Sequence, residues 1–235
     1  MARDPSRGVD AVLFDLDGTL VDSLQTIAEA MVLALRSFGY EMDVARLIPL
    51  IGPPMEVLAR DLGAPPDEAA RINAEYLRLY HNGYVQRTPE TPGASALLDR
   101  LAAAGIALGV VTNKVEQGAR LVLDAEGWAS RFGVVVGRDT PNAAAKPAPE
   151  AAWHALRVLG VPPERAAFVG DTEFDMRCGR AAGIGHVIAL VGNRDADFLW
   201  AEGATHLVHS LEAVGAVLLG AGLLGAGLLD AGAPS

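Results

Sequence analysis

The sequence VDAVLFDLDGTLVDS, at residues 9–23, joins a short apolar run to a cluster of acidic and small residues. The run at 9–14 has the length and hydrophobicity typical of a strand that is buried on both faces of a sheet. It stops at Asp15, and Asp17 follows two residues later. We therefore expect a strand of a parallel sheet whose carboxyl end carries carboxylates.

Short apolar runs of the same kind recur along the chain. They lie at 106–111, 133–136, 166–169, 186–190 and 205–208, and helix-length stretches lie at 115–127, 147–160, 172–182 and 194–203. Short apolar strands that alternate with helices are typical of a parallel sheet covered on both faces. We predict an α/β fold, a doubly wound parallel sheet with a Rossmann-like core.

The first two predicted strands are separated by residues 15–105, although a crossover between parallel strands needs only about a dozen residues. The apolar spacing at 23–38 predicts an amphipathic helix with Asp22 or Ser23 as N-cap, and further helical pieces follow at 43–50, 55–62 and 67–82. We predict a discontinuous catalytic core at 1–21 and 91–212, and an inserted all-helical cap domain at 22–90. A terminal helix should run into a Gly/Ala/Leu-rich tail at 213–235.

The composition excludes several classes of protein. The 235 residues are 51% hydrophobic and carry a net charge of −10, which indicates a folded acidic protein without nucleic-acid or anionic-lipid partners. The single cysteine, Cys178, excludes an intramolecular disulfide. Nothing before residue 213 is apolar enough to span a membrane, and the N-terminus lacks a signal-peptide pattern. We expect a cytoplasmic monomer or homodimer with no membrane partner.

Polar residues follow several of the predicted strands. Thr112 and Asn113 follow the second strand, and GDTEFD, which contains Asp171 and Asp175, follows the fourth. Because the carboxyl ends of parallel strands meet at one edge of a sheet, these side chains should gather beside Asp15 and Asp17. Like charges at such close range raise one another's pKa and destabilise the fold. The cluster therefore predicts a compensating metal ion and a compensating cation.

Lys146 is the predicted cation. The chain has seventeen arginines and only two lysines, so a lysine at this place indicates a specific role. Pro147 should be the first residue of the helix that follows it. Lys114, the other lysine, follows the second strand where a helix begins, and we expect it to be solvated and dispensable.

The residue types predict phosphoryl chemistry. Carboxylate oxygens suit Mg²⁺, and an aspartate can act as a covalent nucleophile toward a phosphoryl group. Asp15 and Asp17 are two residues apart and face the same side in an extended segment, so one can attack while the other transfers protons. Gly18 lets the backbone approach the phosphoryl oxygens. The predicted partner is a small phosphorylated metabolite.

The segments DLDGTLVDS, VVTNK, AKPAPE and GDTEFD occur in this order and resemble the four motifs of the haloacid dehalogenase-like hydrolase superfamily. The resemblance extends to about residue 212. It implies that Asp15 is the nucleophile and Asp17 the general acid/base. It further implies that Thr112 and Lys146 bind the phosphoryl group of the substrate, and that Asn113 contributes to substrate binding mainly through its backbone. Asp171 would bind Mg²⁺ together with Asp15 and the Asp17 backbone carbonyl, and Asp175 would support the metal or Lys146.

Within the superfamily, Asp17 disfavours the dehalogenase branch, and the absence of lysine from 22–90 disfavours the phosphonoacetaldehyde hydrolase branch. The run Gly52-Pro53-Pro54 and the segments TLVDS and GDTEFDM resemble the phosphoglycolate phosphatase-like group, so the predicted substrate is 2-phosphoglycolate. Sugar phosphates, nucleotides, pyrophosphate and a beta-phosphoglucomutase-like mutase are alternatives. A response-regulator receiver is the non-enzyme alternative. Receivers lack a cap, and their acceptor aspartate lies on an interior strand, whereas Asp15 follows the first predicted strand of this chain.

Selection of a carboxylate-bearing leaving group should come from the predicted cap, because a carboxylate asks for a cationic partner. The cap offers six arginines, which are Arg36, Arg46, Arg60, Arg71, Arg78 and Arg87. Arg46 and Arg60 flank the Gly52-Pro53-Pro54 loop, so one of them is the favoured partner.

Overall fold

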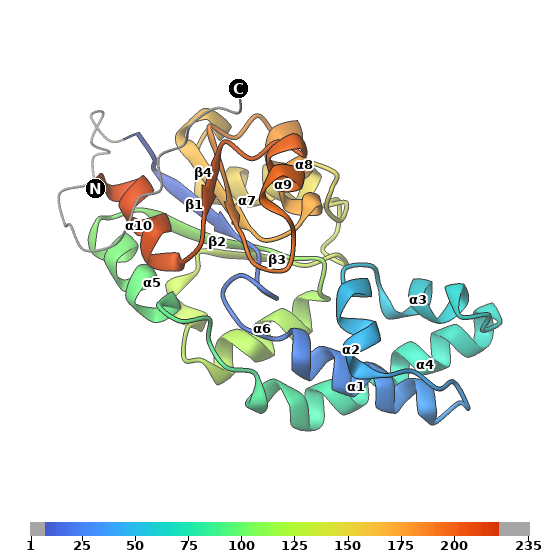
Figure 1. The fold of residues 1–235 in the computed structure, drawn as a ribbon. Helices are drawn as coiled ribbons and strands as arrows, with labels where there is room; N and C mark the ends of the chain where they lie inside the picture. The colour runs from blue at the N-terminus through green and yellow to red at the C-terminus, as the bar shows by residue number, and fades with distance from the viewer. Residues whose placement is uncertain (1–7, 221–235) are drawn as a thin grey trace.

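Six parallel strands form the sheet at the centre of the computed structural model, which describes residues 8–220 (Figure 1). In sheet order they are β3 (Val134–Val136), β2 (Ala107–Val111), β1 (Ala11–Phe14), β4 (Ala166–Gly170), β5 (His186–Leu190) and β6 (His206–Val208). Every predicted strand is present, and the α/β fold is confirmed. Although β1 comes first in the chain, it lies inside the sheet between β2 and β4. The position of the acceptor strand therefore does not separate this chain from a receiver.

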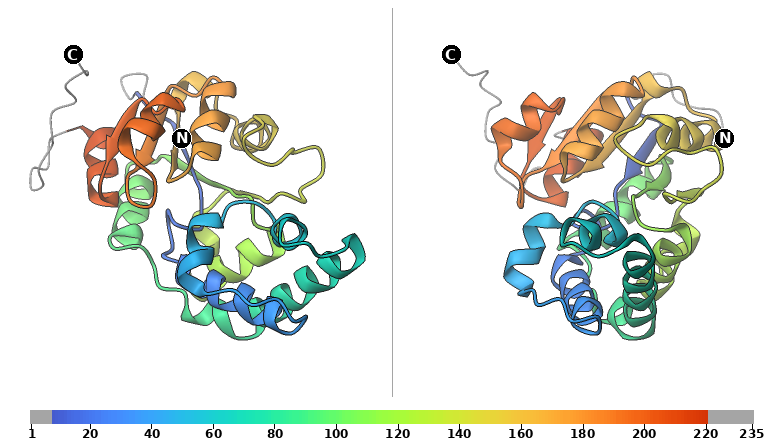
Figure 2. Two further views of the ribbon diagram at one scale, coloured as in Figure 1. Left: turned by 45° about the vertical axis from the view of Figure 1, so that its right-hand side comes forward. Right: turned by 90° about the vertical axis from the view of Figure 1, so that its right-hand side faces the viewer.

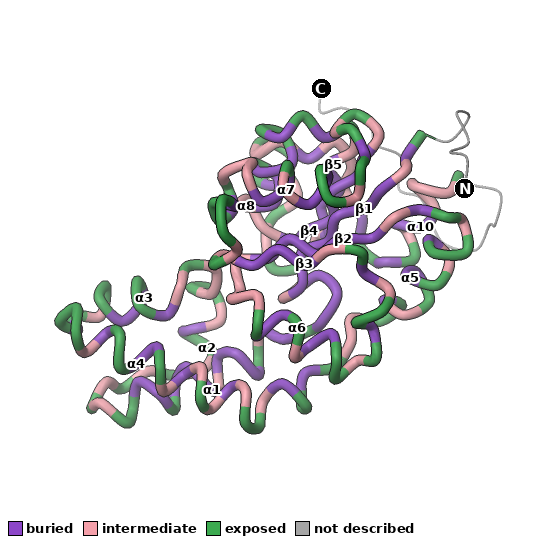
Figure 3. The backbone as a smooth tube through the Cα atoms, turned by 180° about the vertical axis from the view of Figure 1, so that it is seen from behind, coloured by how far each residue is buried: buried purple, intermediate pink, exposed green. Residues whose placement is uncertain are grey.

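The sheet is covered on both faces. Along β1, Val12 and Phe14 pack into one apolar cluster, and Ala11 and Leu13 into the other. The first cluster is closed by α5 (Ala94–Ala103), α6 (Glu116–Ala125) and α10 (Leu211–Leu219), and the second by α7 (Glu150–Leu159), α8 (Glu173–Ala181) and α9 (Ala196–Ala201). Figure 3 shows the strands as an almost unbroken buried layer. The doubly wound arrangement is confirmed.

Two helices differ from the expectations. Helix α5 was not predicted, although Ala94, Leu97, Leu98 and Leu101 repeat at helical spacing and are all buried. Helix α7 begins at Glu150 and not at Pro147, because the chain first makes a turn in which the amide of Ala148 donates to the carbonyl of Ala145.

Residues 22–90, called the helical segment below, leave the sheet and pack beside its carboxyl edge (Figure 2). They form α1 (Leu24–Arg36), α2 (Val44–Leu47), a 3-10 turn (Ile48–Leu50), α3 (Met55–Asp61) and α4 (Pro66–Leu79). A π-helical turn (Tyr80–Tyr84) and a 3-10 turn (Val85–Arg87) continue from α4. Ser23 stands at the N-cap of α1, but its side chain makes no capping hydrogen bond, because it is used elsewhere. The predicted domain boundaries stay a prediction.

The helical segment leaves and rejoins the core through two stretches that lie side by side. The amide of Asp22 donates to the carbonyl of Pro89 at 2.9 Å, and the amide of Thr91 donates to the carbonyl of Leu20 at 2.9 Å. Val21 and Glu90 form an antiparallel bridge between these bonds. The helices are thus anchored to the core at the turn that follows β1.

The C-terminal helix ends at Leu219. Of the predicted terminal helix and tail at 213–235, residues 221–235, which hold most of the Gly/Ala/Leu-rich repeats, lie outside the described residues. Within residues 8–220, no helix combines the length and the apolar character needed to cross a membrane.

Candidate active site

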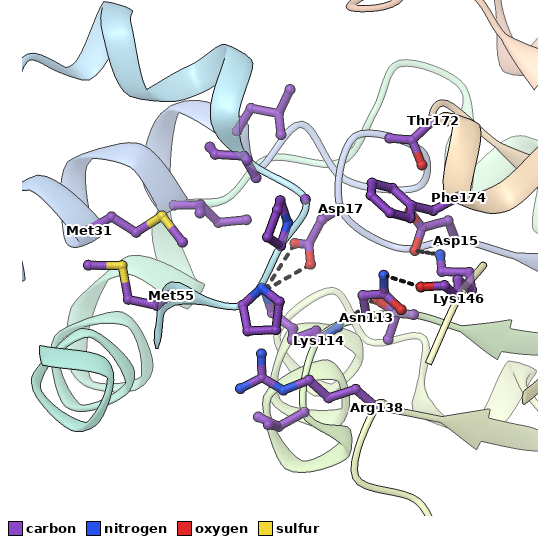
Figure 4. Close-up of a pocket in the computed structure, with 18 of the residues that line it drawn as sticks. Asp15, Asp17, Met31, Met55, Asn113, Lys114, Arg138, Lys146, Thr172 and Phe174 are labelled. Carbon is purple, nitrogen blue, oxygen red and sulfur yellow. Dashed lines mark hydrogen bonds and ion pairs between the residues drawn. The ribbon is translucent and has the colours of Figure 1, made fainter. Parts of the chain in front are cut away.

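The carboxyl ends of the central strands and the helical segment enclose a cavity of about 200 Å³ (Figure 4). Its core side is lined by most of the predicted site residues, which are Asp15, Asp17, Thr112, Asn113, Lys146 and Asp171. The other two predicted site residues, Gly18 and Asp175, do not line the cavity but contact the lining residues Asp171 and Lys146. A Cβ atom on Gly18 would lie 2.5 Å from Oδ2 of Asp171, and the φ of Gly18 is +86°, so only glycine fits there without strain.

Lys146 lies at the centre of a buried charge network. Its Nζ is 2.8 Å from Oδ1 of Asp15 and 2.6 Å from Oδ1 of Asp175. Burial lowers the pKa of Lys146, but the Asp15 and Asp175 carboxylates raise it more, so the net shift is upward and the ammonium stays charged. The side-chain Nδ2 of Asn113 donates to the backbone carbonyl of Lys146 at 3.1 Å and fixes the backbone there. The Asn113 side chain therefore helps to position Lys146, whereas the resemblance implied a contribution mainly through the Asn113 backbone.

Asp175 forms an ion pair with Lys146 and caps the N-terminus of α8. Its Oδ2 accepts from the amide of Thr172 at 3.0 Å and from the Thr172 hydroxyl at 2.7 Å, in a capping box. Both carboxylate oxygens are therefore occupied, and the side chain is fully buried. Of its two predicted supporting roles, the contacts favour support of Lys146.

The acidic cluster fits a divalent cation. Asp15, Asp171 and Asp175 each offer an oxygen within 4.8 Å of the others. Asp171 accepts a hydrogen bond from the Thr19 hydroxyl at 2.8 Å. Burial raises the pKa of Asp15 to about 7 and that of Asp171 well above its usual value, so both carboxylates lack enough positive charge around them. A cation bound between Asp15 and Asp171 would supply that charge.

The Asp17 carboxylate points away from this cluster, toward Lys114 (Figure 4). The Nζ of Lys114 lies 2.9 and 3.1 Å from its two oxygens, and the Ser23 hydroxyl donates to it at 2.7 Å. The Lys114 side chain is only 8% exposed, and its Nζ lies 4.3 Å from the centroid of the Tyr80 ring. The expectation that Lys114 is solvated is wrong. The rarity of lysine, which drew attention to Lys146, applied equally to Lys114.

The helical segment contributes an apolar wall. Its lining residues include Ile27, Met31, Ile51, Met55 and Tyr76. None of its six arginines lines the cavity. Arg46 and Arg60, the two that were favoured, are exposed, and the arginines that do reach the cavity are Arg138 and Arg194 from the core. The predicted source of the selecting cation is therefore wrong.

The chain matches a family model, curated relatives and solved structures. The family model described as haloacid dehalogenase-like hydrolase matches residues 12–189. A phosphoglycolate phosphatase from Xanthomonas campestris is 36% identical over 190 residues, which cover 80% of this chain and 86% of the relative. A tyrosine-protein kinase from Mycobacterium bovis is 33% identical over 212 residues, or 89% and 72% of the two chains. The crystal structure of a HAD family hydrolase from Deinococcus radiodurans, with bound phosphate and sodium, matches at a TM-score of 0.72 and 27% identity, over 93% of this chain and 99% of that one.

Proposed function

The chain belongs to the haloacid dehalogenase-like hydrolase family, as its motifs predict, and we propose that it is a Mg²⁺-dependent phosphatase of a small phosphomonoester, with 2-phosphoglycolate as substrate. The observation that carries the proposal is the buried Lys146 ammonium between Asp15 and Asp175 at the floor of the cavity. A nucleophilic carboxylate that is held beside a fixed positive charge is suited to attack an anionic phosphoryl group.

In the first step, an oxygen of Asp15 attacks phosphorus, and the bond from phosphorus to the leaving oxygen breaks. Asp17, which must enter this step as the protonated carboxyl, gives its proton to that oxygen, so the products of the step are an alcohol, a phosphoryl group on Asp15 and the Asp17 carboxylate. In the second step, water attacks phosphorus while Asp17 takes a proton from it. The Asp15 carboxylate and inorganic phosphate are released. Lys146 and Thr112 face the phosphoryl oxygens throughout.

Asp15 and Asp171 are the proposed ligands of Mg²⁺, together with the backbone carbonyl of Asp17 that the family resemblance implies. When bound, the ion supplies positive charge to the phosphoryl oxygens. Gly18 leaves room for the Asp171 carboxylate, and the Thr19 hydroxyl donates a hydrogen bond to that carboxylate and orients it. These contacts hold Asp171 ready to bind the ion.

The size of the cavity supports a small substrate. Its volume of about 200 Å³ lies below the range of roughly 300–1,000 Å³ that is typical of sites for drug-sized ligands. The phosphatase from Xanthomonas campestris is named for the same small substrate. The helical segment of residues 22–90, which receivers lack, disfavours the receiver alternative. One relative is named as a kinase, and a kinase transfers a phosphoryl group to a hydroxyl group, whereas a phosphatase transfers it to water. An experiment must therefore identify the group that accepts the phosphoryl group.

The proposal is tested by assaying the purified chain for release of inorganic phosphate. The panel should contain 2-phosphoglycolate, a hexose phosphate, a nucleoside monophosphate and pyrophosphate, each with Mg²⁺ and with excess EDTA. We expect kcat/KM for 2-phosphoglycolate to exceed that of the others by at least about tenfold, a difference of ~1.4 kcal/mol in transition-state binding. EDTA should abolish turnover, and added Mg²⁺ should restore it. Activity that EDTA leaves unchanged contradicts the metal assignment, and a flat substrate profile contradicts the substrate.

A further inference from the structure

The cavity has four lysine or arginine side chains among its lining residues, and three of them are already paired with carboxylates. Lys146 is paired with Asp15 and Asp175, and Lys114 is paired with Asp17. The Nε of Arg194 lies 3.1 Å from a carboxylate oxygen of Glu173. These three cations therefore face the cavity with most of their charge balanced.

Arg138 is the fourth. Within residues 8–220, its guanidinium makes no ion pair or side-chain hydrogen bond, although the residue is half-buried. The acidic residues next to it in sequence and space are engaged elsewhere, since Asp139 accepts from the amide of Glu116 at 2.7 Å and Glu116 accepts from Thr140 and Arg120. A half-buried guanidinium has five donors and cannot lose its proton, so it favours an anionic ligand.

The position of Arg138 suits a group at the far end of a substrate from its phosphoryl group. Its amide donates to the Lys114 carbonyl at 3.0 Å, in the loop that follows β3. Figure 4 shows the guanidinium on the Lys114 side of the cavity and not on the Lys146 side. Burial raises the pKa of Tyr76 to about 12, and the charges of Lys114 and Arg138 both oppose that rise, as expected of cations near the same apolar wall.

We infer that Arg138 is a specificity-determining residue that binds an anionic group, a carboxylate, on the leaving group of the substrate. The inference rests on the proposed phosphatase function and refines it. The helical segment brings no cation of its own beyond His81 to the cavity, and burial and the nearby Lys114 lower the pKa of His81, which keeps that ring neutral. Recognition of the leaving group is therefore assigned to the core, and the apolar wall limits its size.

The test compares two substrates that share the reacting phosphate. 2-Phosphoglycolate carries a carboxylate, and 2-hydroxyethyl phosphate carries a neutral hydroxyl of similar size. We expect Arg138→Gln to lower kcat/KM for 2-phosphoglycolate by at least about tenfold, because the charge-assisted pair with the substrate carboxylate is lost, and to change kcat/KM for 2-hydroxyethyl phosphate by less than about twofold. Arg138→Lys should give an intermediate loss, because an ammonium cannot form the bidentate pair.

A charge-reversal variant and a matched control complete the experiment. Arg138→Glu should shift the preference from 2-phosphoglycolate toward phosphoethanolamine, whose leaving group is cationic. Arg60→Gln, which removes an exposed arginine of the helical segment, should leave both substrates unchanged. Melting temperatures of all variants show whether they fold, and Arg138→Lys carries the test if the other variants do not.

The outcomes separate the two proposals. Equal losses on both substrates, or no loss on either, overturn the role of Arg138 and leave the phosphatase function standing. A selective loss in Arg60→Gln also overturns it, since recognition would then lie in the helical segment. A wild-type chain that hydrolyses no phosphomonoester overturns the proposed function and this inference together.

Discussion

The core edge and the helical segment line the same cavity with opposite chemistry. At the edge, Asp15, Lys146 and Asp175 form a buried network with ion-pair distances of 2.6–2.8 Å. On the other side, Met31, Met55 and their neighbours present apolar surface. Bond-making thus depends on a few charges whose loss is costly, while the opposite wall acts through shape. A substitution in one region should therefore change a different kinetic quantity from a substitution in the other.

The largest expected effect is that of Asp15→Asn at the core edge. An amide is not a nucleophile, so turnover should fall by about 10⁴-fold or more, as in other enzymes that lose their nucleophile. The fold should persist, because the two side chains have nearly the same shape. The measurement is steady-state phosphate release by wild type and variant, with Mg²⁺ present.

The pH dependence of thermal stability provides a second, activity-independent test of the Asp15→Asn variant. Burial raises the pKa of Asp15 from 3.8 to about 7 in the folded chain. A group whose folded pKa lies above its unfolded pKa stabilises the protein at low pH, and this contribution is lost as the pH rises through about 7. In EDTA, the melting temperature of Asp15→Asn minus that of wild type should therefore rise from pH 5 to pH 8, whatever constant cost the loss of the contact with Lys146 adds. A difference that does not change with pH contradicts the burial of a carboxylate whose charge Lys146 compensates only in part.

An intermediate effect is expected at Lys114, where the two regions meet. Lys114→Met removes the charge that holds Asp17 and the contact with the Tyr80 ring, while keeping much of the side-chain volume. We expect kcat to fall by roughly 10–100-fold, which is less than the loss of about 10²–10⁴-fold typical of removing a general acid/base, because Asp17 itself remains, and we expect a smaller change in KM. Poor leaving groups should lose more than an aryl phosphate, since they need the proton from Asp17.

The comparison of substrates decides the role of Lys114. An equal loss with good and poor leaving groups would assign the effect to packing between the core and the helical segment. Retention of full activity would restore the original expectation that this lysine is dispensable.

The smallest effect is expected from Met55→Leu in the apolar wall. The two side chains have similar volumes, so the free energy of unfolding should change by less than about 1.5 kcal/mol. We expect KM to change by a few fold and the rate of Asp15 phosphorylation in single-turnover experiments to stay the same. A large drop in that rate, with KM unchanged, would contradict the division of labour between the two regions.

The core edge was readable from the sequence because topology fixes where strand ends lie. Once residues 9–14 and 166–169 are recognised as parallel strands, Asp15 and Asp171 must lie at the same edge of the sheet, and the pairing of β1 with β4 in the structure brings them together. No comparable rule says which face of a helix in residues 22–90 turns toward the cavity. The choice of Arg46 and Arg60 therefore failed, and Arg138 was missed because its place depends on how the loop after β3 turns. Lys114 was misjudged since burial of a cation beside Asp17 depends on Tyr80, a residue from the other region.

The paired stretches at Leu20–Asp22 and Pro89–Thr91 have an evolutionary consequence. Since the chain leaves the core and returns to it at hydrogen-bonded neighbours, the entropy of closing the intervening loop grows only slowly with its length. Mutation can therefore lengthen, shorten or replace most of the chain between these two points without moving β1 or Asp15. A lineage built on this core is free to change the size of leaving group that it accepts by exchanging one contiguous stretch of its gene.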